Sequence, residues 1–209
     1  MKKMIIQHAV IGQVFTNVYF LMHEDSKEML IVDPADDASR IVAMVGQMQA
    51  KPVGILLTHG HYDHILAAET IRDHYDIPIY AGSKEEEFLA DPSLNLTLFT
   101  GRSLSLVPDV LLEDGQESTL AGFSMKTFHT PGHTKGSVCY YFPEEEILIS
   151  GDTLFHGSVG RTDLPTGSSG QIVQSLHRLL EELPEETQVL PGHDTSTSIG
   201  YEKRYNPFV

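Results

Sequence analysis

The stretch LLTHGHYDHIL constrains the fold of this chain more than any other, because it places four metal-ligand side chains where an apolar run ends. The four residues are His59, His61, Asp63 and His64. Alternate residues of an extended strand point to the same side, so His59 and His61 can approach one ion. Asp63 and His64 lie where the next helix is expected to begin, and they face the place of a second ion close by. Imidazole and carboxylate groups suit zinc, iron or manganese.

Four ligands do not complete two metal sites, so the fold must bring further ligands to this strand end. Three later residues follow apolar runs in the same way: His133 in TPGHTKGS, Asp152 in LISGDTLF and His193 in VLPGHD. Taken singly, each could be a turn residue or a turn cap. Their shared position at the ends of predicted strands favours metal ligands, because functional residues concentrate on loops that such elements position.

The first half of the sequence predicts strands that alternate with helices. Two β-rich runs, 17–22 and 28–34, are separated by a short polar segment and predict a hairpin. Apolar residues at helical spacing predict helices over 38–49 and 65–76, and a strand follows each of them. This β-α-β-α-β order is typical of an α/β fold.

The second half begins with a predicted helix over 83–93, in which Glu85, Glu86 and Glu87 are interpreted as a solvated face. Short strands, a Gly- and Ser-rich loop, an amphipathic helix and a final strand follow over 104–155, 157–170, 170–184 and 187–194. Each half therefore mixes strands with helices. This order predicts two mixed β-sheets packed face to face, with helices outside.

Length and charge limit the class of protein. A chain of 209 residues can bury one sizeable core, and we expect a single domain over 1–209. The net charge of -15 argues against nucleic acid as a partner. Cys139 is the only cysteine, so no disulfide within the chain is expected.

Neither an export signal nor a membrane span is predicted. Residues 1–17 lack the continuous apolar core of a signal peptide. No segment approaches the roughly 20 apolar residues that cross a bilayer. The expected location is therefore the cytoplasm, without a membrane partner, and the sequence leaves the oligomeric state open.

The combined motifs THGHYDH, TPGHTKGSVCYYF, SGDTLF and LPGHD resemble the metallo-β-lactamase superfamily, and within it the short bacterial-type glyoxalase-II-like hydrolases. The resemblance runs from about Gly12 to the C-terminus. It implies an αββα sandwich with a two-metal centre at one edge. No separate C-terminal helical region that binds glutathione is expected, since only 16 residues follow His193.

The resemblance assigns a role to each of the seven ligand candidates. They are His59, His61 and His133 for one metal, Asp63, His64 and His193 for the other, and Asp152 as the bridge between them. Two divalent ions are therefore expected, with zinc as the first choice and iron or manganese as alternatives. Asp63 and Asp152 are the expected catalytic carboxylates.

Two adjacent ions can lower the pKa of a shared water and so supply hydroxide at neutral pH. A thioester fits this chemistry well, because its leaving thiolate has a parent pKa of about 8.5 and needs little protonation. The resemblance points to an acyl-glutathione such as S-lactoylglutathione as the small-molecule substrate. Arg161 and His156, in the loop after Asp152, are candidate substrate contacts. Arg161 could equally brace the loop through Asp163.

A different reaction class remains open. Persulfide dioxygenases share the fold and the GRTD element, and they hold one iron through residues that match His59, His133 and Asp152. A lactone or ester hydrolase is a further alternative, since its metal ligands are nearly the same. A nuclease conflicts with the acidic charge. A secreted β-lactamase fits less well. No export signal is predicted, and such enzymes usually have a cysteine or another ligand where this chain has Asp152.

Overall fold

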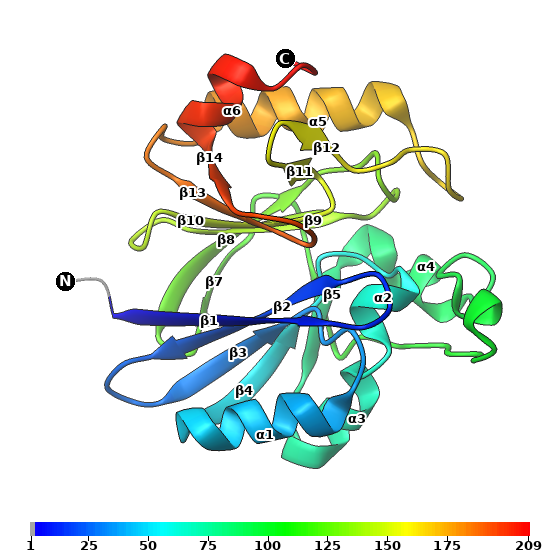
Figure 1. Ribbon diagram of the computed structural model, residues 1–209, viewed down its shortest axis with the longest axis vertical. Coiled ribbons are helices and arrows are strands. Elements are labelled where there is room, and N and C mark those ends of the chain that lie inside the picture. Colours follow the sequence, from blue (N-terminus) through cyan, green and yellow to red (C-terminus); the bar gives the residue numbers. More distant parts are fainter. Residues whose placement is uncertain (1–2) are drawn as a thin grey trace.

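Two six-stranded β-sheets pack face to face in the computed structural model, which describes residues 3–209 (Figure 1). The first sheet has its strands in sequence order: β1 (Met4–Ile11), β2 (Thr16–His23), β3 (Glu28–Val32), β4 (Lys51–Leu56), β5 (Ile79–Gly82) and β6 (Val110–Leu112). The second sheet has the order β14 (Thr197–Ser198), β13 (Gln188–Pro191), β10 (Ile147–Gly151), β9 (Val138–Phe142), β8 (Phe123–His129) and β7 (Glu117–Leu120). Each sheet is therefore built from one continuous half of the chain.

Both sheets are mixed, as the sequence predicts. In the first sheet β1, β2 and β3 are antiparallel, and β3 to β6 are parallel. In the second sheet β10 and β13 are parallel, and the remaining pairs are antiparallel. A small hairpin of β11 (Leu154–Phe155) and β12 (Ser158–Val159) follows β10.

Helices cover the outer face of each sheet (Figure 1). On the first sheet these are α1 (Ala38–Met48) and α3 (Ala68–Tyr75), whereas α2 (Tyr62–Ile65) and α4 (Glu86–Ala90) lie to one side of the sheets. The first half also has 3₁₀ turns at η1 (Ser83–Glu85) and η2 (Thr97–Thr100). The helices of the second half are α5 (Ser169–Glu182) and α6 (Ile199–Tyr205). Because the central strands are buried on both faces, they are almost continuously apolar. On β2, Phe20 packs toward α1 and α3, whereas the next residue, Leu21, packs between the sheets.

Several predicted elements need correction. The strand β1 and the helix α6 were not predicted. The helix expected over 65–76 is interrupted, because the amides of Leu66 and Ala67 donate to the carbonyls of Ala35 and Pro34. The helix expected over 83–93 consists of η1 and α4, and its first glutamate, Glu85, is buried rather than solvated.

Within residues 3–209, no helix combines the length and the apolar character that a membrane span requires. The first two residues of the N-terminal segment, which entered the prediction of no export signal, lie outside the described residues. That residues 1–209 form a single domain stays a prediction.

Candidate metal centre

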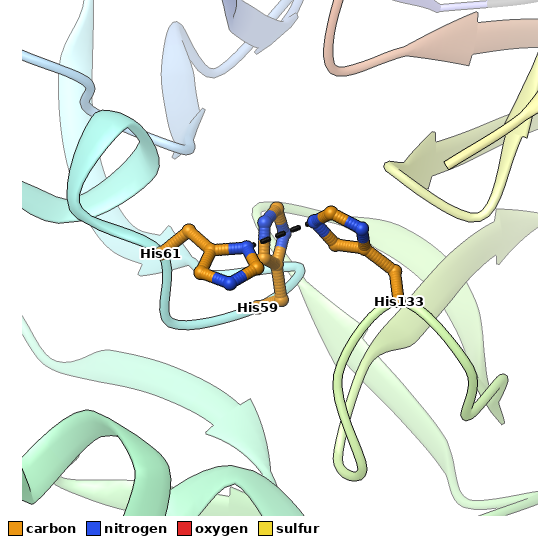
Figure 2. Close-up of side chains that lie close together, drawn as sticks. All are labelled: His59, His61 and His133. Atoms are coloured by element: carbon orange, nitrogen blue, oxygen red, sulfur yellow. Dashed lines mark hydrogen bonds between the residues drawn. The ribbon is translucent and has the colours of Figure 1, made fainter. Parts of the chain in front are cut away.

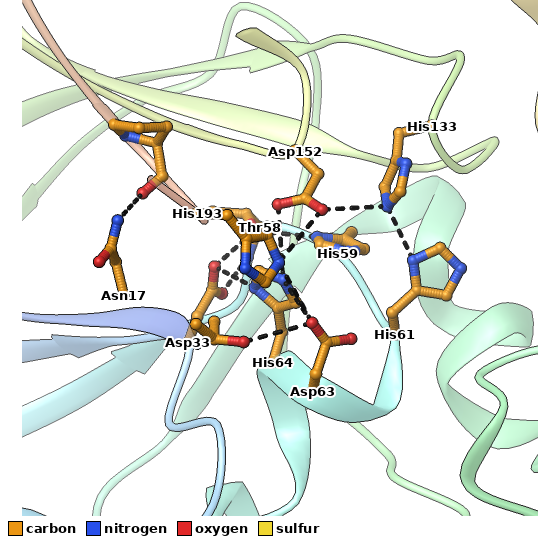
Figure 3. A network of polar contacts seen from close by, with 12 residues as sticks. Asn17, Asp33, Thr58, His59, His61, Asp63, His64, His133, Asp152 and His193 are labelled. Carbon is orange, nitrogen blue, oxygen red and sulfur yellow. Dashed lines mark hydrogen bonds and ion pairs between the residues drawn. The ribbon is translucent and has the colours of Figure 1, made fainter. Parts of the chain in front are cut away.

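The seven predicted ligands come together where strands of both sheets end, at the seam between the sheets (Figure 3). His59 and His61 follow β4, and Asp63 and His64 lie in the short helix α2. The other three follow strands of the second sheet, His133 after β8, Asp152 directly after β10 and His193 after β13. A backbone hydrogen bond of 2.7 Å from the Asn17 amide to the Gly192 carbonyl joins the two sheets beside them.

His59, His61 and His133, here called the first triad, offer ligand atoms that all lie within 4.8 Å of one another. His61 Nδ1 and His133 Nε2 are 2.8 Å apart (Figure 2). All three side chains are buried. Two ring nitrogens that face each other so closely suit a shared cation, because both can then present lone pairs to it.

Asp63, His64 and His193, the second triad, also offer ligand atoms within 4.8 Å of one another. Asp63 Oδ2 lies 3.4 Å from His64 Nε2 and 3.2 Å from His193 Nε2. Asp152 lies between the triads: its Oδ2 is 3.5 Å from His133 Nε2 and 3.5 Å from His193 Nε2 (Figure 3). That Asp152 bridges two ions stays a prediction.

The chemistry of this donor set fits divalent metal. Among the described residues, His59 Nε2, His64 Nε2 and Asp152 Oδ1 are buried and have no hydrogen-bond partner. Buried polar atoms almost always have one. These unpaired atoms belong to residues that form a group within 4.8 Å. Cations bound within the cluster would satisfy all three atoms.

The electric field at the cluster also attracts positive charge. Burial acts to lower the pKa of His64, but the carboxylates of Asp63, Asp152 and Asp33 overcome it and raise that pKa to about 10. Burial acts to raise the pKa of Asp63, but His64 and His193 hold it well below its usual range. In the first triad, burial and the charge of His133 lower the pKa of His61 to about 3. Burial likewise lowers the pKa of His59, so His59 and His61 stay neutral, as ligand imidazoles must.

Hydrogen bonds from outside the cluster fix the ring orientation of the ligands. His64 Nδ1 donates to Asp33 Oδ2 at 2.9 Å, which leaves Nε2 facing the cluster. His133 Nδ1 donates in the same way to the Arg161 carbonyl at 2.8 Å. Asp33 is itself fixed by the Thr58 amide and hydroxyl, at 2.8 and 2.6 Å. Asp33 is not among the residues predicted from the sequence, although it directly follows the buried strand β3, just as Asp152 directly follows an apolar run.

Gly192 keeps the cluster tight. A Cβ at this position would lie 2.3 Å from Asp152 Oδ1 and 2.8 Å from His64 Cε1. Any side chain here would therefore displace Asp152 or His64.

A cleft of about 310 Å³ opens over the cluster. Five ligands line it: His61, Asp63, His133, Asp152 and His193. Its other walls are largely apolar: Val14, Leu96, Phe155 and Leu164, with Tyr62 and Arg161.

The two predicted substrate contacts differ in position. Arg161 lines the cleft, and its guanidinium makes two hydrogen bonds of 2.7 and 2.8 Å to Asp163. It therefore braces the loop and faces the cleft at once. His156 is exposed and stacks on Tyr201 of α6, with ring centroids 4.6 Å apart. The geometry thus favours Arg161 over His156 as a substrate contact.

The fold and the donor set define a class of protein in which a His/Asp cluster at the edge of two packed sheets binds divalent metal. The chain belongs to the metallo-beta-lactamase superfamily, whose family model matches residues 11–193. It is 40% identical over 201 residues to the probable metallo-hydrolase YqgX of Bacillus subtilis, covering 95% of this chain and 94% of that protein. It is 32% identical over 192 residues to the hydroxyacylglutathione hydrolase GloC of Haemophilus influenzae, covering 90% and 91%.

Solved structures agree with this assignment. BLEG-1 B3 metallo-beta-lactamase superimposes with a TM-score of 0.92 at 42% identity, covering 98% of this chain and 99% of that one. The di-iron-bound form of TTHA1623 superimposes with a TM-score of 0.85 at 34% identity, covering 97% and 100%. The predicted fold is confirmed, and the chain is a metallo-hydrolase of this superfamily.

Proposed function

We propose that this protein hydrolyses thioesters, with an acyl-glutathione such as S-lactoylglutathione as the substrate. The observation that carries the proposal is the convergence of two ligand triads, with Asp152 between them, on the floor of one open cleft. The first triad would hold one ion, the second triad the other, and Asp152 would contact both. The ions, when bound, would supply Lewis-acid activation of water and of the substrate carbonyl.

The side chains that line the cleft favour a substrate whose leaving group departs without being protonated. Among the described residues that line it, Tyr62 and Arg161 are the only ionisable side chains besides the proposed ligands. A thiolate, with a parent pKa of about 8.5, needs no general acid, whereas an amine would. The similarity to a hydroxyacylglutathione hydrolase supports the same substrate class.

The remaining groups of the cleft would orient the substrate. Asp63 and Asp152 line the cleft and contact the ligand imidazoles, so they are the proposed catalytic carboxylates. Leu96 and Phe155 would contact the acyl group, and Arg161 would attract an anionic part of the thiol. Zinc is the proposed metal, and the di-iron form of TTHA1623 supports iron as the alternative.

Hydrolysis of a β-lactam is a second candidate, favoured by 42% identity to BLEG-1 B3 metallo-beta-lactamase. One experiment separates the candidates. Metal content per chain is measured together with turnover of S-lactoylglutathione, hydrolysis of a chromogenic cephalosporin, and oxygen uptake on glutathione persulfide. About two metals with thioester cleavage supports the proposal. One iron with oxygen consumption would replace it with the mononuclear dioxygenase, for which His59, His133 and Asp152 are the expected ligands.

A further inference from the structure

Glu85 is a buried carboxylate that joins the two loops of the first triad. It is 1% exposed and ends the 3₁₀ turn η1. Its Oε1 accepts a hydrogen bond of 2.8 Å from the amide of Gly60, the residue between His59 and His61. Its Oε2 accepts one of 3.0 Å from the hydroxyl of Thr134, the residue after His133. One side chain therefore connects ligand loops that belong to different sheets.

The loop that carries His133 also approaches Glu85 very closely. A Cβ on Gly136 would lie 2.3 Å from the Glu85 amide nitrogen and 2.4 Å from Oε2. No side chain other than hydrogen fits at this position without displacing one of the two segments. The contact is therefore a specific junction, in which the glycine permits the approach that the carboxylate bonds require.

In the first triad, His59 and His133 each have a hydrogen-bond partner at the ring nitrogen that points away from the other two rings. Among the described residues, His61 has no partner at the corresponding nitrogen. His59 Nδ1 lies 3.1 Å from the Thr58 hydroxyl, and His133 Nδ1 is bonded to a carbonyl. His61 Nε2, by contrast, is buried without a partner among the described residues. Its position depends on the backbone at Gly60, which Glu85 holds, and on an edge contact with Phe88, with ring centroids 5.3 Å apart.

From this geometry we infer that Glu85 is a positioning residue for the first metal, an inference that rests on the proposed metal centre. It holds the loop of His61 against the loop of His133, so that His61 Nδ1 and His133 Nε2 converge on one point. Outer contacts of this kind typically change metal affinity by about 10- to 100-fold when they are removed.

The test replaces Glu85 by glutamine. An amide keeps the shape but offers one acceptor oxygen, whereas Gly60, Thr134 and Gly136 all donate to Glu85. The matched control is Glu202→Gln: Glu202 is also fully buried and accepts from Gly157 and Thr197, away from both triads. Three quantities are measured on both variants: zinc affinity by chelator competition, the visible spectrum of the cobalt-loaded protein, and the melting temperature of the metal-free protein.

We expect E85Q to weaken one of the two zinc sites at least tenfold, with a changed cobalt spectrum, and to leave the other site within about twofold. E202Q should lower the melting temperature and keep both affinities. Equal losses of melting temperature, with parental zinc affinity and spectrum in both variants, would show that Glu85 is merely structural.

A second variant covers the case in which E85Q does not fold. Thr134→Val removes one donor and keeps the Glu85 carboxylate. Weaker zinc binding at one site supports the inference, and unchanged binding overturns it. Because none of these readouts is turnover, absence of thioester cleavage in the parent would refute the proposed function without touching this result.

Discussion

Replacing Asp33 by asparagine tests how the second triad is organised. Asp33 accepts three hydrogen bonds, from the Thr58 amide, the Thr58 hydroxyl and His64 Nδ1. Asparagine has one acceptor oxygen and one NH₂ group, so the NH₂ must face a donor in either orientation. If it faces His64, the imidazole must carry its proton on Nε2, the atom that faces the cluster. If it faces Thr58, a buried amide loses its partner.

Both orientations have a calculable cost. Loss of an outer hydrogen bond to a ligand histidine lowers metal affinity by about 10- to 100-fold, or roughly 1.4 to 2.7 kcal/mol. A buried donor without a partner costs about 1 to 3 kcal/mol of unfolding free energy. At about 2 to 4 °C per kcal/mol for a chain of this size, the melting temperature of the metal-free protein should fall by roughly 2 to 12 °C.

Calorimetry of the metal-free protein and chelator competition for zinc measure the two effects. Asp36→Asn is the control, because Asp36 makes a part-exposed ion pair of 3.2 Å with Arg102, a contact worth about 0 to 1 kcal/mol. Its Oδ1 also accepts a hydrogen bond of 2.9 Å from the Asp37 amide, which an asparagine oxygen can accept as well. Zinc affinity of D33N within twofold of the parent, together with a melting temperature equal to that of D36N, would refute this account of His64.

Three further outcomes are expected. Asp152→Ala should lose both metals and all turnover, and metal analysis that finds two ions with a retained rate would defeat the bridging assignment. Burial raises the pKa of Glu85 from 4.5 to about 7. The folded state then keeps a proton that the unfolded state has lost, so the contribution of Glu85 to the stability of the metal-free protein should fall by roughly 3 kcal/mol as pH rises through this range. Urea unfolding at pH 5 and pH 8 should show that the parent loses more stability than E85Q by about this amount, since the other titrating groups are common to both. Leu96→Ala should lower kcat/KM about fivefold for thioesters with long apolar acyl chains and leave short ones unchanged, as a series of S-acyl-glutathiones would show.

The ligand cluster was predictable because its signals are local. His59, His61, Asp63 and His64 are close in sequence, and Asp152 follows a run of apolar residues. Strands such as β2 and β3 were predictable for the same reason, since burial on both faces leaves a continuous apolar run. The pairing of particular ligands with each metal came only from the resemblance, because spacing does not reveal which loops meet.

Features that depend on distant contacts were missed. Glu85 stands in a run with Glu86 and Glu87, which are exposed, and its burial arises from the approach of Gly136 from the other sheet. The break between α2 and α3 also depends on a distant segment. The amides of Leu66 and Ala67 donate to the carbonyls of Ala35 and Pro34, which lie far from them in the sequence. The residues next to Glu85 or to Leu66 in the sequence do not indicate which distant segment contacts them.

The division of the sheets between the two halves of the chain makes both triads depend on the docking of the sheets. The first sheet ends at Leu112 and the second begins at Glu117, so each can form from contacts within its own half. The first triad takes His59 and His61 from one half and His133 from the other, and the second triad is divided in the same way. Neither triad exists until the two sheets have docked. During refolding, the rate of metal binding would therefore report the rate at which the two sheets dock.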